Sequence, residues 1–134
     1  MCVDVDAPEE FFDWLDRTEA KARSGNEPSR RLLARAVDAL AQLRALAAAP
    51  QTETPDLRRV RQSRHYPVWR TSHPYDRDIA FRLICWFPPE STTVVVALFG
   101  ADKAQMGDVF YDSVGARADA AIRQWTVQKG TDDE

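Results

Sequence analysis

The chain has 134 residues, of which 44% are apolar and 29% are charged, and its formal net charge is −3. This length suits a single domain, residues 1–134, and the composition excludes collagen-like and wholly disordered chains. The longest apolar run, residues 92–100, is far below the roughly 20 residues that cross a bilayer. The only two cysteines, Cys2 and Cys85, are far apart and lack the spacing of a metal site or a disulfide framework. So few cysteines are typical of proteins in a reducing compartment. We expect a cytoplasmic protein that binds no metal and does not contact a membrane.

The small net charge hides an uneven distribution along the chain. Residues 1–27 hold eight acidic and three basic side chains, whereas residues 57–82 hold seven arginines against two aspartates. The planar guanidinium group of arginine matches a phosphate group with two parallel hydrogen bonds. A GC-rich genome would also enrich arginine over lysine, so the pattern favours a phosphate-binding middle segment without requiring one.

The first half of the chain predicts a strand and two helices. Residues 2–6 alternate apolar and polar side chains, as in a short strand at a sheet edge. Asp6 is expected to cap a helix that starts near Pro8 and ends at residues 24–26. A second amphipathic helix follows this short break, so residues 8–49 are expected to form an αα-hairpin. The apolar positions of the second helix are Leu33, Val37, Leu40 and Ala47.

From residue 57 onward, apolar residues recur with a period of two, which indicates strands. Four strand segments are expected, at residues 57–61, 66–71, 79–87 and 92–99. In the third segment Phe81, Leu83 and Cys85 fall on one face, and Arg82, Ile84 and Trp86 on the other. The proline turn at residues 88–91 predicts that the last two strands pair as an antiparallel hairpin.

Helical periodicity returns after the strands. It predicts a closing helix over residues 104–126, followed by a frayed tail at 127–134. With the β-meander over residues 57–100, the order of elements predicts an α+β domain. We expect the helices to cover one face of the sheet and to leave the other face open for chemistry.

Three segments carry a resemblance to a known family: Tyr-Pro-Val-Trp-Arg at 66–70, Ile-Ala-Phe-Arg-Leu-Ile-Cys-Trp-Phe at 79–87, and the run from 94 to 103 that ends in Lys103. In order and spacing they resemble the strands of the RelE/ParE superfamily of bacterial toxins, in its HigB-like branch. The resemblance implies a RelE-like fold, with an N-terminal strand and αα-hairpin before the meander and the closing helix.

The same resemblance implies a function. Such a protein is the toxin of a type II toxin–antitoxin system, an endoribonuclease that cleaves mRNA on the ribosome without a metal or cofactor. Its expected partners are mRNA, the ribosome and a cognate antitoxin of the helix-turn-helix type.

Candidate catalytic residues follow from the chemistry of metal-free RNA cleavage, which requires cations that stabilise the charge of the phosphorane. Arg70 and Arg82 are the leading candidates, because their apolar next-but-one neighbours should aim each guanidinium group away from the core. Lys103 follows the last strand and could hold the phosphate. Tyr111 or His65 could act as general acid or base. The candidate RNA contacts are Arg58, Arg59, Arg61, Arg64 and Trp69.

Each candidate has a structural alternative. Arg70 and Arg82 could be solvated strand residues, or ion-pair partners of Asp76, Asp78 or Asp102. Two other functions also fit the pattern, because a fold alone does not determine function. One is a ParE-like poison of DNA gyrase that hydrolyses nothing. The other is a non-catalytic, phage-derived interaction module whose basic strands bind an acidic partner.

Overall fold

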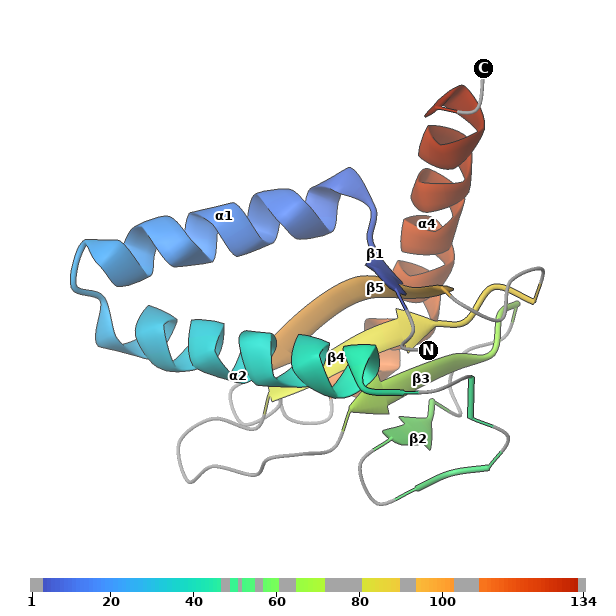
Figure 1. Cartoon of the computed structure of the whole chain (residues 1–134), viewed down its shortest axis with the longest axis horizontal. Helices are drawn as coiled ribbons and strands as arrows, with labels where there is room; N and C mark the ends of the chain where they lie inside the picture. Colours follow the sequence, from blue (N-terminus) through green and yellow to red (C-terminus); the bar gives the residue numbers. More distant parts are fainter. Residues whose placement is uncertain are drawn as a thin grey trace.

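The computed structural model describes residues 4–46, 49–50, 52–54, 57–60, 65–71, 81–89, 94–102 and 109–132. The elements in these ranges are β1 (Asp4–Asp6), α1 (Glu9–Arg23), α2 (Glu27–Arg44), β2 (Leu57–Arg59), β3 (Val68–Thr71), β4 (Phe81–Trp86), β5 (Val94–Asp102) and α4 (Val109–Asp132). These described elements form a mixed α/β fold of three helices and one five-stranded sheet, which is compatible with the predicted α+β class (Figure 1).

The strands lie in the order β1-β5-β4-β3-β2. The strands from β2 to β5 pair antiparallel in chain order, as predicted for the meander. β1 is an edge strand, also as predicted, and pairs parallel with the start of β5, where Val5 lies opposite Val95. The β4–β5 ladder shifts register between Ile84 and Cys85. This bulge turns the consecutive residues Leu98 and Phe99 into the same hydrophobic cluster.

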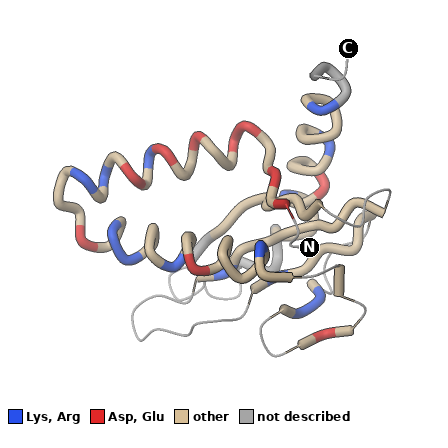
Figure 2. Tube along the Cα trace, in the orientation of Figure 1, with Lys and Arg blue, Asp and Glu red and all other residues tan. Residues whose placement is uncertain are grey.

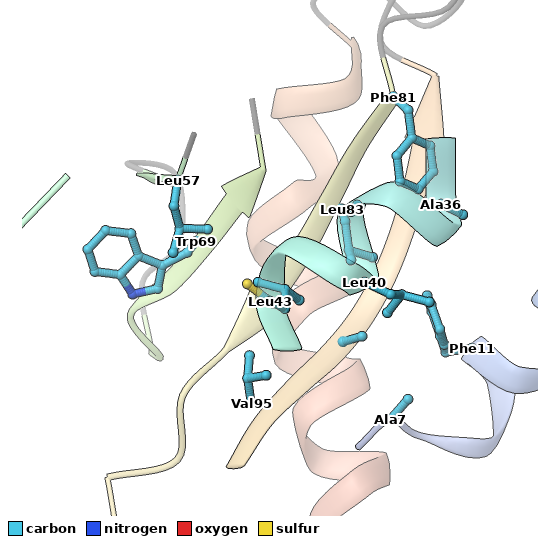
Figure 3. Packing of buried hydrophobic residues seen from close by; sticks show 13 residues of the cluster. Ala7, Phe11, Ala36, Leu40, Leu43, Leu57, Trp69, Phe81, Leu83 and Val95 are labelled. Carbon is cyan, nitrogen blue, oxygen red and sulfur yellow. The ribbon is translucent and has the colours of Figure 1, made fainter. Parts of the chain in front are cut away.

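The two faces of β4 pack against different helices. Leu83 and Cys85 belong to a cluster that includes Leu40 and Leu43 of α2 (Figure 3). Ile84 and Trp86 belong to a second cluster that α4 completes; its α4 members are Val114, Ala118, Ala121 and Ile122. The predicted division of β4 into two faces is confirmed, and the sheet is the middle layer between the helical hairpin and α4 (Figure 1).

The prediction of an open sheet face is therefore wrong. The face that points away from the hairpin is as apolar as the other, since Ile84, Val96 and Leu98 are all buried there. Leaving such a surface in water would forfeit the free energy of apolar burial. The closing helix α4 covers this surface. The candidate arginines of this face are therefore accessible only where α4 does not cover the sheet.

The break between α1 and α2 lies where the sequence places it. Ser24 is the C-cap of α1, and Gly25 has the positive φ of 96° that commonly ends a helix. Asn26 then caps α2, because its side-chain oxygen accepts a hydrogen bond from the Ser29 N–H at 2.9 Å. The two helices pack as the predicted hairpin (Figure 1).

The apolar face of α2 differs from the prediction. Val37 is 52% exposed, and Leu33 is half-buried. The residues of α2 that are buried are Ala36, Ala39, Leu40 and Leu43. The buried stripe is rotated toward the small alanines because they let the helix backbone approach the sheet closely. Ala47 lies outside the described residues.

The N-terminus of α1 is not capped by Asp6, contrary to the prediction. The N-cap residue is Pro8, which makes no side-chain cap hydrogen bond. Instead the Glu9 N–H donates to Oε1 of Gln128 at 3.0 Å, and the next N–H donates to Oε1 of Gln124 at 3.4 Å. Two side chains of α4, more than 100 residues away, thus satisfy donors that a helix N-terminus leaves unpaired.

α4 extends further than the predicted closing helix. Residues 127–132, expected to belong to a frayed tail, are helical to Asp132, and the expected start at residue 104 lies outside the described residues. Asp6 fastens this helix to the sheet edge, because its carboxylate accepts a hydrogen bond from Nε1–H of Trp125 at 3.0 Å. None of the helices described is long and apolar enough to cross a membrane.

Candidate functional site

Three of the predicted arginines lie on one face of the sheet, and we call Arg58, Arg70 and Arg82 the arginine row. Arg58 of β2 is opposite Arg70 of β3, which in turn is opposite Ile84 of β4. Arg82 precedes Ile84 by two residues and therefore shares its face, diagonally from Arg70 at about 7–8 Å. Ile84 packs in the α4-side cluster. The arginine row thus occupies the face that α4 covers.

Exposure falls steadily along the arginine row. Arg58 is exposed, Arg70 is half-buried and Arg82 is only 8% exposed. The expectation that the apolar neighbours aim both guanidinium groups away from the core therefore fails for Arg82. Its apolar neighbours do turn it away from the hairpin, but the second face is also buried, which the alternation of β4 alone does not reveal.

The guanidinium group of Arg82 has little compensation for its burial. Nη1 donates to the carbonyl oxygen of Phe81 at 3.1 Å, and Nε has no hydrogen-bond partner in the described part of the chain. A buried cation without a carboxylate partner is costly, because it has lost its hydration. Of the alternative partners, residues 76 and 78 and the side chain of Asp102 lie outside the description. This environment favours an anion close to Arg82.

Arg59 and Trp69 lie on the opposite face from the arginine row. They form a cross-strand pair, with the Arg59 guanidinium carbon 5.4 Å from the centroid of the Trp69 ring. Trp69 is 7% exposed and packs edge-on against Phe87 in the hairpin-side cluster. Trp69 is thus a residue of the hairpin-side core and not an exposed platform for an RNA base (Figure 3). Arg59 does not contribute to the same surface as Arg58, because neighbouring residues of a strand point to opposite faces.

His65 lies away from Arg82. The hydrogen bond from the Val60 N–H to the Val68 carbonyl closes β2 and β3 just before the connection that carries His65. Val68 is opposite Trp86, at the end of β4 away from Arg82, roughly 13 Å along the strand. The predicted catalytic set therefore does not converge at one point.

His65 does have an acidic neighbour that the sequence analysis missed. Its Nε2 lies 3.7 Å from Oδ2 of Asp119 on α4. Asp119 is 8% exposed, and its Oδ1 has no hydrogen-bond partner among the described residues. The only sequence signal was an acidic residue directly beside the apolar stripe of the closing helix. Such a pair can orient the imidazole ring, although it lies apart from Arg82.

The side chains of the remaining candidates lie outside the described part of the structure. Arg61, Arg64 and Lys103 lie outside the described residues, and Tyr111 is in the first turn of α4 with its side chain undescribed. Figure 2 shows the charge of the described trace, with acidic positions frequent along α1 and basic positions on β2. Among the described arginines of the basic segment, Arg59 lies on the opposite face of the sheet from the arginine row.

Other reactive groups offer little chemistry. Burial raises the pKa of the Cys85 thiol to about 12, so this core thiol is not a nucleophile near neutral pH. Within the described ranges, no three His, Cys, Asp or Glu side chains group as a metal site would require.

No family model, curated protein or solved structure matches the chain. The arginine row is therefore the best candidate site on physical grounds.

Proposed function

We propose that this protein has a RelE-like fold and is the toxin of a type II toxin–antitoxin system, an endoribonuclease that cleaves mRNA on the ribosome without a metal. The observation that supports this most is the arginine row. Three guanidinium groups on neighbouring strands share one face, and the innermost, Arg82, is buried with no carboxylate partner among the described residues. A phosphodiester supplies the anion that such a group lacks.

The three arginines have different roles in this proposal. Arg58 is exposed and makes the first contact with the RNA backbone. Arg70 stabilises the charge that develops on the phosphorane during attack by the 2′-hydroxyl group. Arg82 is buried and does not contact the RNA directly. Its charge raises the positive electrostatic potential at the phosphate, because a low-dielectric environment screens the charge weakly. The cognate antitoxin would inhibit the enzyme by covering this region.

The test is inducible expression in a bacterial host with mapping of transcript 5′ ends. We expect growth arrest, loss of translation and new 5′ ends within coding sequences. Arg70→Ala should reduce cleavage by about 100-fold or more, which is typical for loss of a charge-stabilising group. Arg58→Ala should also weaken the arrest.

Arg59→Ala is the matched control, because Arg59 is adjacent in sequence and exposed but lies on the other face. It should leave the arrest unchanged. Equal effects of Arg58→Ala and Arg59→Ala would contradict the assignment of the site. Growth arrest with intact transcripts and DNA damage would favour the gyrase poison of the same fold.

One observation favours a second candidate function, a non-catalytic interaction module. The face that carries the arginine row is covered by α4, and Arg82 is almost fully removed from solvent. In this candidate the exposed Arg58 binds an acidic protein and no bond is cleaved. Expression without growth arrest and with intact transcripts would support it over the endoribonuclease.

A further inference from the structure

A cleft of about 350 Å³ lies between α1, the second half of β5 and α4. Leu98, Phe99 and Gly100 of β5 line its floor. β1 pairs only with Val94–Val96, so this part of β5 lies beyond the end of the neighbouring strand. The cleft contains no residue of the arginine row, and it is formed by segments that are far apart in the sequence.

Small residues keep this space open. Ala120 and Ala121 face it from α4, and neither side chain is long enough to fill it. The walls are aromatic, with Phe11 and Trp14 contributed by α1. The cleft therefore combines aromatic walls with a polar rim, and its volume is in the range that small-molecule sites commonly have.

The rim of the cleft carries more positive than negative charge. Arg17 of α1 and Arg117 of α4 line it together with Glu10 and Gln124. The guanidinium carbon of Arg117 lies 4.1 Å from the centroid of the Phe99 ring, a cation–π contact that holds the cation at the mouth. No carboxylate in the described ranges forms an ion pair with Arg17 or Arg117.

We propose that this cleft binds a small organic carboxylate with a flat aromatic body. The aromatic part lies beside Phe11 and Trp14, where stacked or edge-to-face contacts are available, because Arg117 already covers one face of the Phe99 ring. The carboxylate meets Arg117 and Arg17, whose planar forks match its two oxygens. One net positive charge at the rim favours a monoanion. This site is independent of the arginine row, so it stands whether or not the protein cleaves RNA.

Isothermal titration calorimetry with 2-naphthoate tests the proposal, and 2-naphthalenemethanol is the neutral probe with the same ring system. We expect 2-naphthoate to bind with a Kd of about 0.1–1 mM, as befits a ligand of this size. The alcohol should bind at least ~10-fold more weakly, because it lacks the charge that the arginines recognise. Equal affinities, or no binding of 2-naphthoate up to several times the expected Kd, would overturn the proposal.

Matched variants separate the cleft from the rest of the surface. Arg117→Gln and Arg17→Gln should each weaken 2-naphthoate binding by about 10-fold, whereas Arg123→Gln, at an exposed position of α4 outside the cleft, should not. Ala120→Leu should abolish binding by filling the space, and Ala116→Leu is its exposed control on the same helix. Thermal unfolding shows whether each variant is folded. Loss of binding in the controls as well would refute the assignment of the site.

Discussion

Because the guanidinium group of Arg82 is a buried cation, we expect its replacement by an apolar side chain to stabilise the protein but to abolish the proposed activity. Arg82→Met replaces the guanidinium group with an apolar side chain of similar length. The change removes one charge-assisted hydrogen bond, from Nη1 to the Phe81 carbonyl at 3.1 Å, worth about 1.5–3 kcal/mol. It also removes the desolvation cost of a cation that is 8% exposed, which is several kcal/mol. We expect the free energy of unfolding to rise by about 1–3 kcal/mol.

Urea denaturation followed by tryptophan fluorescence measures this change directly. Arg58→Met is the control, because Arg58 is exposed in the same row and its replacement should change the free energy of unfolding by less than about 0.5 kcal/mol. Under the proposed function, Arg82→Met should lose cleavage while gaining stability. A variant that is destabilised by more than about 1 kcal/mol would show that the guanidinium contacts are structural, and the reasoning about an uncompensated cation would be refuted.

Three further predictions test the packing and the caps. Gly100→Ala should lower the free energy of unfolding by about 1–3 kcal/mol, because the new Cβ atom would lie 2.5 Å from the buried ring of Phe81. Adding Phe81→Leu to the same chain should recover part of this loss, which thermal unfolding measures. Gln128→Ala should cost about 0.5–2 kcal/mol in urea denaturation by uncapping α1, and an equal loss for Arg123→Ala on the same helix would contradict this reason. The pKa of Cys85 rises from 9.0 to about 12 on folding, so the unfolded thiol ionises first and stability falls as the pH rises from 9 toward 12. Cys85→Ala should make this fall shallower by up to about 1.4 kcal/mol per pH unit, and an unchanged slope would show that Cys85 does not cause it.

Under the proposed function, the exposed and the buried arginines should differ in their response to salt. Only Arg58 of the arginine row is exposed, so under the proposed function the first encounter with RNA depends on β2 at the sheet edge. Attraction at this edge weakens as salt screens exposed charges, whereas the field of a buried Arg82 is screened much less. Binding and cleavage should therefore respond differently to ionic strength.

Local information in the sequence was sufficient for the elements themselves. The period-two pattern located β2 to β5 and divided β4 into an arginine-bearing and a cysteine-bearing face, because successive side chains of a strand point to opposite sides. Gly25 and Asn26 marked the break of the hairpin, since one adopts positive φ and the other supplies a capping oxygen. Both signals depend on residues only a few positions apart, so they can be recognised in the sequence before the fold is known.

Only the tertiary structure decided what each face contacts. α4 packs on the face that the sequence suggested was open, and this placement brings Asp119 close to His65. The same placement lets Gln128 cap α1 and opens a cleft between Arg17 and Arg117. These contacts join residues about 50 to 120 positions apart, and no local periodicity of the sequence records them. They follow from the apolar area that the sheet exposes on both sides, which one closing helix must cover after the chain crosses to the second face.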